Sequence, residues 1–423
     1  MDNRELPSVD YAHGCLIKAN GKEFIDSTAG GTSYAILGWN SPEINNAITQ
    51  QLMKYAHMDY KLWQDPNIDA LAKLVTMQAP SPLSRVYFAG NSGAEACEAA
   101  MKMSFQTHAI EGNHAKKWFI SRKQSYHGST SDALALGDRP NLEFYRPMLS
   151  PYRVHVDMHH FNKLSIAGET EEDYSSRCAK QLEDKILEIG PENVAAFVGE
   201  TIMGGLVGDV PPVGNYWRKI SSVCKKYNVH LILDEVYCGT GTSGTYFCYE
   251  QDNFEPDLVF MGKTLAAGYG ALSVVASTER IYETIKKSAD NRLQHTTTHQ
   301  AHSLSVAAAL EVQKTIAEPN FLAEVRRKGE LFRKLFSQAL EASSRIVDIR
   351  GRGLRFSIEH NIENQVEFGR KMEISCAENY QVLVNAKWHR ICFTPPLIIS
   401  DREIEKVVEA TSQSFLKLSK NFK

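Results

Sequence analysis

The chain has 423 residues, of which 43% are hydrophobic and 23% are charged, and its formal net charge at pH 7 is −3. This length suffices for a large core and more than one domain, and the small net charge gives no electrostatic reason to expect nucleic acid or an anionic membrane as a partner. No apolar stretch is long enough to span a bilayer, and the first residues do not resemble a signal peptide, so we expect a cytoplasmic protein. The eight cysteines form no C-x-x-C pair, so we expect neither a disulfide framework nor a zinc site.

The first fifty or so residues are typical of a β-hairpin, with "GCLIKANGKEFIDSTAG" at 14–30. Short apolar runs that favour β-strands then alternate with helical patterns. These runs lie at 85–90, 117–122, 194–200, 229–234 and 256–263, and an amphipathic helical pattern at 216–228 precedes the fourth. Apolar strands that alternate with helices predict an α/β protein with a mostly parallel sheet covered on both faces.

The character of the chain changes at about residue 311. A charged helical pattern at 321–342 is followed by short strand patterns at 347–359 and 390–400. We interpret this region as a smaller α+β domain that packs with the N-terminal hairpin. The predicted division is therefore an N-terminal segment of the small domain at 1–55, a large domain at 56–310, and the C-terminal part of the small domain at 311–423.

A glycine-rich loop follows the strand at 229–234. Gly239, Gly241 and Gly244 match the spacing G-x-G-x-x-G, which binds dinucleotides when a helix begins directly after it. The segment after Gly244 is instead aromatic and polar and ends at a proline, so it is a poor helix former. The glycines therefore predict a tight loop rather than a dinucleotide site.

Two apolar strands end in side chains that carry chemistry. Asp234 ends "LILD", and Lys263 ends "LVFMGK". A buried acid at the carboxyl end of a parallel strand needs a cationic partner, and ligands bind at that edge of open α/β sheets. A lysine that forms a Schiff base and a carboxylate that keeps the ring nitrogen protonated are the pair that pyridoxal phosphate requires.

Other strand ends supply the remaining parts of such a site. After the strand at 85–90, Gly93 and Ala94 begin a helix whose free N–H groups could bind the cofactor phosphate. Tyr126 follows the next strand and could stack on the ring, and Glu200 ends a third strand. Each residue alone is more often a cap or a surface residue, so the prediction depends on their convergence.

Several longer stretches form a pattern that goes beyond single residues. They are "ANGKEFIDSTAG" and "GWNSPEI" near the N-terminus, "LILDEV" followed by "PDLVFMGKTLAAGYGALS", and "FTPPLIIS" near the C-terminus. Together they make nearly the whole chain resemble the class III pyridoxal-phosphate-dependent aminotransferases, the ω-aminotransferase group of the fold type I enzymes. The resemblance implies a large domain with a mostly parallel seven-stranded sheet, a smaller α+β domain, and a homodimer, or a tetramer, with shared active sites.

The resemblance also implies roles for individual residues. Lys263 would form the Schiff base with pyridoxal 5′-phosphate, and Asp234 would pair with the pyridinium nitrogen. The ring would lie between Tyr126 and Val236, and Glu200 would help to order Asp234 and its neighbours.

The phosphate would be bound from two subunits. Gly93 and Ala94 would donate backbone N–H groups, and Thr298 would reach the phosphate of the partner subunit. A rival interpretation treats the histidines around Thr298 as a metal site, because they are spaced H-x3-H-x2-H. However, three consecutive threonines disfavour a helix, and no acid lies among them, so we predict no metal here. These histidines are His295, His299 and His302.

The chain departs from the family where substrate carboxylates bind. The arginine before "xxPPL" that usually binds the α-carboxylate is replaced by Cys392, and the glutamate that gates it is replaced by Gly205. Asn385 stands where some members have a second arginine. These losses predict that pyruvate is preferred over 2-oxoglutarate as acceptor, with an amine or ω-amino acid as donor. Arg390 and Trp63 are the candidate substrate contacts.

Two other departures affect the cofactor side. Tyr237 replaces a glutamine that usually touches the cofactor hydroxyl, and Thr242 replaces the arginine of the glycine-rich loop. The predicted activity is transamination by a ping-pong mechanism through pyridoxamine phosphate. Alternatives on the same fold are an aminomutase, similar to the glutamate-1-semialdehyde enzymes, and a decarboxylase. A non-catalytic binding protein is disfavoured because it would have no need of Lys263.

Overall fold

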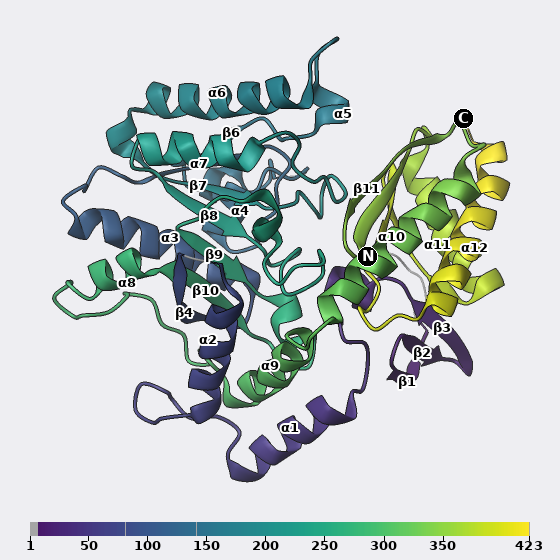
Figure 1. Cartoon of the computed structure of the whole chain (residues 1–423), viewed down its shortest axis with the longest axis horizontal. Coiled ribbons are helices and arrows are strands. Elements are labelled where there is room, and N and C mark those ends of the chain that lie inside the picture. Colours follow the sequence, from purple (N-terminus) through teal and green to yellow (C-terminus); the bar gives the residue numbers. More distant parts are fainter. Residues whose placement is uncertain (1–6, 81, 141, 423) are drawn as a thin grey trace.

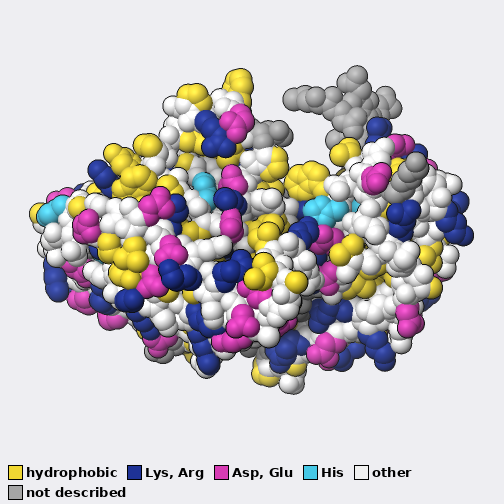
Figure 2. Space-filling model, turned by 90° about the horizontal axis from the view of Figure 1, so that it is seen from above, with side chains coloured by type: hydrophobic (Ala, Val, Ile, Leu, Met, Phe, Trp, Pro, Cys, Tyr) yellow, Lys and Arg dark blue, Asp and Glu magenta, His cyan; other side chains and the backbone are white. Residues whose placement is uncertain are grey.

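The computed structural model describes residues 7–80, 82–140 and 142–422, and in it a large α/β body lies beside a smaller body of strands and helices (Figure 1). The small body contains both the N-terminal hairpin and the C-terminal helices. On the face shown in Figure 2, acidic and basic side chains are interspersed. Within the described part of the chain, no helix combines the length and the apolar character needed to cross a membrane.

The large body is built on a seven-stranded sheet, as predicted. β10 is antiparallel to both its neighbours, and the other adjacent pairs are parallel. The strands in sheet order are β4 (Leu83–Gly90), β10 (Ser273–Thr278), β9 (Leu258–Met261), β8 (His230–Asp234), β7 (Val194–Glu200), β5 (Trp118–Arg122) and β6 (Arg153–Val156). The sequence patterns located five of these strands. They missed β6, which lies between the second and third predicted runs, and β10, which follows the last one.

Helices cover both faces of this sheet. The residues of β8 alternate, so that Ile232 joins the core beneath α3 while Leu231 and Leu233 join the core on the other side. Because both faces are buried, every residue of β7, β8, β9 and β10 is buried, which explains why apolar residues predominate in these strands. The helices of this body are α2 (Pro66–Gln78), α3 (Gly93–Ile110), α4 (Ser131–Leu136), α5 (Phe161–Leu164), α6 (Glu171–Ile189), α7 (Tyr216–Lys226) and α8 (Glu279–Ile285).

The small body contains two four-stranded sheets. One joins β1 (Val9–His13), β2 (Leu16–Ala19), β3 (Lys22–Asp26) and β13 (Val382–Leu383). β3 pairs in parallel with β13, so the N-terminal hairpin shares a sheet with the C-terminal region. The second sheet has the order β11 (Ile346–Arg352), β12 (Arg355–His360), β15 (Arg390–Phe393) and β14 (Asn385–Lys387), and the helices here are α10 (Phe321–Leu340), α11 (Gln365–Tyr380) and α12 (Asp401–Leu418).

Two helices lie near the predicted segment boundaries. α1 (Pro42–Lys54) ends beside the boundary at 55, and it packs against α9 (Ser303–Ile316), which crosses the boundary at 310. The first six residues of the predicted segment 1–55 lie outside the described residues.

The glycine-rich loop is not followed by an α-helix. Gly241 and Gly244 have φ angles of +91° and +93°, a conformation that favours glycine, and the next regular element is a short 3-10 helix at Cys248–Asp252. The loop therefore turns tightly, in agreement with the rejection of a dinucleotide site.

Candidate active site

Three adjacent parallel strands bring their ends to one edge of the large sheet. In the register, Glu200 of β7 lies opposite Asp234 of β8, which lies opposite Phe260 of β9. Lys263 follows β9 after a single glycine. Asp234 and Glu200 are each only 5% exposed. The structure therefore brings together the acid and the amine that the sequence placed at separate strand ends.

The carboxylate of Asp234 is held by two contacts. Oδ1 accepts a hydrogen bond from the backbone N–H of Val236 at 3.0 Å, and Oδ2 lies 2.8 Å from Nδ1 of His127. His127 is buried, and its Nε2 has no hydrogen-bond partner among the described residues. Sequence reasoning missed His127, although it adjoins Tyr126 in "SYHG" and could have been considered with it.

Glu200 fixes the backbone on two sides of the site. Its Oε1 accepts the N–H of Tyr126 at 3.0 Å, and its Oε2 accepts the N–H of Gly204 at 2.8 Å. Burial raises the pKa of Glu200, His127 opposes that shift, and the charge of Asp234 adds to it. Glu200 thus orients the segment that carries Tyr126 and His127.

Lys263 has an unusual backbone and a shifted pKa. Its φ angle is +33°, which is uncommon for a residue other than glycine and typical of functional sites that store strain. Burial lowers the pKa of Lys263, Asp234 and Glu200 oppose that shift, and Arg355 adds to it. A lowered pKa leaves a larger share of the amine uncharged, as a nucleophile and a general base require.

The N-terminus of α3 leaves two backbone donors free. Ser92 and Glu95 form a capping box, in which the Ser92 hydroxyl accepts the N–H of Glu95 and the Glu95 carboxylate accepts the N–H of Ser92. The N–H groups of Gly93 and Ala94 have no acceptor in the described chain. Two free donors at a helix N-terminus suit a phosphate group.

This helix terminus lies directly against the strand ends. A Cβ atom added to Gly93 would lie only 2.7 Å from both methyl groups of Val236, and one added to Gly262 would lie 3.3 Å from the nitrogen of Gly93. The free N–H groups therefore adjoin both Val236 and the residue before Lys263. The donors, the lysine and the acid fit pyridoxal phosphate, with the donors bound to its phosphate.

The remaining predicted residues lie in different environments. Tyr126 is half-buried, and the guanidinium of Arg139 lies 5.5 Å from the centre of its ring. Trp63 is 63% exposed, and Thr298 is also exposed on this single chain. Arg390 is only 1% exposed and donates a hydrogen bond of 2.7 Å to the carbonyl oxygen of Gly205.

The histidine-rich segment does not form the helix that its metal-binding interpretation required. α9 begins only at Ser303, after His302. The rings of His299 and His302 instead lie near that of His57, at 5.9 Å and 4.7 Å between ring centres.

One group of potential metal ligands lies beside the site. Glu235, Cys238 and Cys248 are buried, and their ligand atoms lie within 4.8 Å of one another. The carboxylate of Glu235 already accepts hydrogen bonds from the Thr201 hydroxyl and from the N–H groups of Cys248 and Tyr249. Because these bonds satisfy the carboxylate, we interpret Glu235 as an anchor for the glycine-rich loop.

The chain is similar to known aminotransferases in both sequence and structure. The family model of class-III aminotransferases matches residues 2–415. A γ-aminobutyrate transaminase of Solanum lycopersicum is 34% identical over 92% of this chain and 76% of its own length, and an uncharacterized aminotransferase of Schizosaccharomyces pombe is 32% identical over 97% and 93%. The ω-transaminase of Pseudomonas jessenii, solved with PMP, superposes with a TM-score of 0.91 at 30% identity and covers 98% of this chain and 93% of its own.

The fold and the strand-end residues define a pyridoxal-phosphate-dependent enzyme of fold type I. Within that class, the chain belongs to the class-III aminotransferase family. An aminotransferase from Vibrio fluvialis has the same fold, with a TM-score of 0.92 at 23% identity. Amino-group transfer is therefore the activity of this family and of this chain.

Proposed function

We propose that this enzyme transfers an amino group from an ω-amino acid or a simple amine to pyruvate in preference to 2-oxoglutarate, by a ping-pong mechanism. The observation that carries the general activity is the convergence of Lys263, Asp234 and the free N–H groups of Gly93 and Ala94 at one sheet edge.

Each residue contributes a separate task. Pyridoxal phosphate, when bound, supplies the electron sink and holds the amino group between the two half-reactions. Lys263 would bind the cofactor and later move a proton at the substrate carbon, for which its lowered pKa is suited. Asp234 would keep a proton on the ring nitrogen, with His127 holding its carboxylate in place. Tyr126 and Val236 would bound the two ring faces.

The names of relatives support an amine distant from a carboxylate as donor. Plant relatives at 32–34% identity are γ-aminobutyrate transaminases, and the solved neighbours are ω-transaminases. Cys392 and Gly205 lack the side chains that bind and gate a second carboxylate in the family, and burying that carboxylate without a cation costs several kcal/mol. Pyruvate carries only one carboxylate, which supports it as the acceptor.

A homodimer would complete the site. Thr298 and Trp63 are exposed on the single chain, in keeping with roles at the partner's phosphate and at an active-site entrance. Size-exclusion chromatography with light scattering tests this: a dimer or tetramer is expected, and an active monomer would contradict shared active sites.

A donor-by-acceptor screen tests the proposed reaction. The purified enzyme with pyridoxal phosphate is mixed with 4-aminobutanoate, β-alanine or 1-phenylethylamine, and with pyruvate or 2-oxoglutarate. Alanine should form faster than glutamate at equal acceptor concentration. A higher kcat/KM for 2-oxoglutarate would refute the acceptor preference. Isomerisation of the amino donor in the absence of an acceptor would instead indicate an aminomutase, and release of carbon dioxide from the donor would indicate a decarboxylase.

A further inference from the structure

The second sheet of the small body has one apolar face and one polar face. Alternate residues of β12 and β15, such as Phe356, Ile358 and Phe393, point into the core with Phe332 and Phe336 of α10. The residues between them form the opposite face, which we call the polar face. It comprises Arg355, Ser357 and Glu359 of β12 and Arg390 and Cys392 of β15.

The polar face contacts the segment at 203–210 of the large body. The Ser357 hydroxyl lies 2.6 Å from Oδ2 of Asp209, and also 3.3 Å from the sulfur of Cys392 opposite it in the register. This segment begins three residues after Glu200, the last residue of β7, so the polar face lies close to the strand ends of the candidate site.

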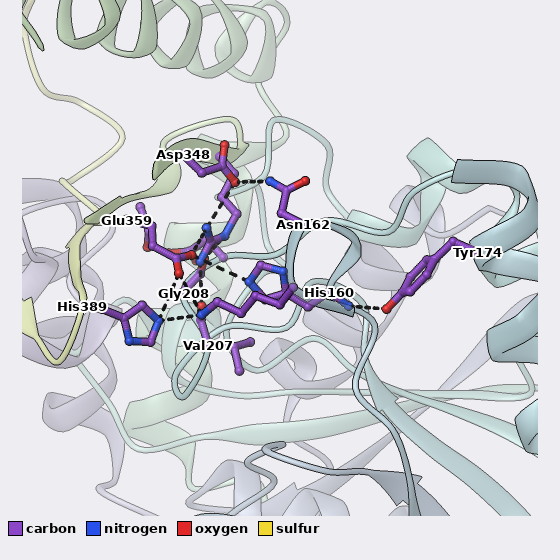
Figure 3. Close-up of polar contacts among 12 residues, drawn as sticks. His160, Asn162, Tyr174, Val207, Gly208, Asp348, Glu359 and His389 are labelled. Carbon is purple, nitrogen blue, oxygen red and sulfur yellow. Dashed lines mark hydrogen bonds and ion pairs between the residues drawn. The ribbon is translucent and has the colours of Figure 1, made fainter. Parts of the chain in front are cut away.

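At the Glu359 end of the polar face, several charged side chains contact one another (Figure 3). Glu359 forms an ion pair with Lys163 at 2.8 Å and a second ion pair with Arg350. Arg350 in turn donates to the carbonyl oxygens of Val207 and Gly208, each at 2.8 Å. Glu359, Lys163 and Arg350 therefore have partners within the chain.

Arg355, at the other end, differs sharply from Arg350. It is 0% exposed, and none of its three guanidinium nitrogens has a hydrogen-bond partner among the described residues. The carboxylate within ion-pairing range is that of Asp209, with 3.8 Å between NH1 and Oδ1, too long for a hydrogen bond. A buried guanidinium without acceptors is costly, so an anionic partner from outside the chain would satisfy it.

The unpartnered guanidinium of Arg355 lies near Lys263. Its carbon atom is 3.0 Å from the centre of the Tyr237 ring, and Nζ of Lys263 is 5.8 Å from the same centre. The two cations are therefore no farther apart than these two distances added together. A 2-oxo acid that reacts near Nζ while its carboxylate binds a guanidinium needs a separation of roughly 7–9 Å, which this arrangement permits.

Arg390 is less available for that task. Its NH2 is bound to the carbonyl oxygen of Gly205, whereas its Nε and NH1 have no partner among the described residues, and its guanidinium lies 4.6 Å from the centre of the Trp388 ring. These contacts tie Arg390 to the segment at 203–210 and to its own hairpin. They leave Arg355 as the guanidinium adjoining Tyr237 and Lys263.

We propose that Arg355 binds the carboxylate of the 2-oxo acid acceptor and determines the preference for acids over neutral carbonyl compounds. The inference rests on the proposed function and names the residue that compensates for Cys392. Its planar fork suits bidentate binding of a carboxylate, and its burial strengthens that interaction.

A matched pair of acceptors tests the role. Pyruvate and pyruvamide have the same shape and differ in the carboxylate charge. The rate constant for each is measured by stopped-flow absorbance with the amino form of the cofactor-loaded enzyme. In Arg355→Met, the rate constant for pyruvate should fall about 10- to 100-fold, whereas that for pyruvamide should change less than about threefold. Calorimetry should show a similar loss in affinity for propionate, an unreactive monocarboxylate.

Two further variants keep the test decisive. Arg355→Lys retains the charge beside Asp209 but loses the fork, so it should fold and lower the pyruvate-to-pyruvamide ratio at least about fivefold. Arg327→Met removes an exposed arginine of α10 and should leave the ratio unchanged. If the wild-type enzyme converts no carbonyl acceptor, the proposed function fails. If the wild type is active but neither Arg355 variant changes the ratio, the role of Arg355 is overturned.

Discussion

Replacement of Asp234 by asparagine tests the electronic role of the strand-end acid. The substitution removes one buried negative charge and keeps the shape of the side chain. An asparagine oxygen can still accept the N–H of Val236, and its amide can still donate to Nδ1 of His127, because the free Nε2 of His127 lets the ring adopt either tautomer. The variant should therefore fold and bind cofactor.

The expected loss is in the rate. Asp234 is 5% exposed, so its charge acts on the ring nitrogen in a poorly solvated environment. Breaking a buried charge pair costs about 3–5 kcal/mol, which corresponds to a rate loss of roughly a hundred- to a few-thousand-fold. The assay is the single-turnover half-reaction with a saturating amine donor, followed by the absorbance of the cofactor.

The control is Asp290→Asn, which makes the same chemical change at an exposed position. It should retain the wild-type rate. Circular dichroism melting of both variants separates rate from stability. If Asp234→Asn reacts within about threefold of the wild type while it binds cofactor normally, the charge of Asp234 does not support catalysis and the reasoning is wrong.

Three other substitutions probe the neighbouring parts of the site. Lys263→Ala should bind cofactor without turnover. Borohydride should attach a pyridoxyl group to Lys263 in the wild type only, as read by peptide mapping. Because burial lowers the pKa of this amine, the fraction of enzyme that captures cofactor should fall to half at a pH below about 10.4, the pKa of free lysine. Gly93→Ala places a methyl group 2.7 Å from the Val236 methyls, so overpacking of about 1–3 kcal/mol should weaken cofactor binding roughly 5- to 150-fold in a fluorescence titration. Glu200→Gln cannot accept both N–H groups that the carboxylate accepts, so urea unfolding should show a loss of about 1–3 kcal/mol.

A different result would contradict each of these three predictions. A pyridoxyl group on another lysine would reassign the attachment site. If the Gly93→Ala variant combined with Val236→Ala regains no cofactor affinity, crowding against Val236 is not the cause of the loss. An unchanged unfolding midpoint in Glu200→Gln would mean that its two backbone contacts contribute little to stability.

Local patterns were sufficient to predict much of this protein. The apolar runs that end at Asp234, Glu200 and Lys263 indicated buried parallel strands, because a strand covered on both faces needs apolar side chains throughout. Polar residues directly after such strands stand out, and their convergence follows from parallel pairing. The glycine-rich loop was also interpreted correctly, since the segment after Gly244 lacks the features of a helix. Strands β10 and β6 were missed because their short apolar runs lack clear boundaries.

Tertiary structure alone decided which polar groups meet. His127 reaches Asp234 across 107 positions in the chain, and Arg355 reaches Tyr237 only because the small body packs against the segment at 203–210. Sequence reasoning named Arg390, which lies two residues from Cys392, as a candidate substrate contact, and it passed over Arg355. Proximity along the chain does not show whether a guanidinium finds partners after folding. Satisfaction of a buried charge depends on every group that the fold brings within reach, so only the packed structure separates the paired Arg350 from the unpaired Arg355.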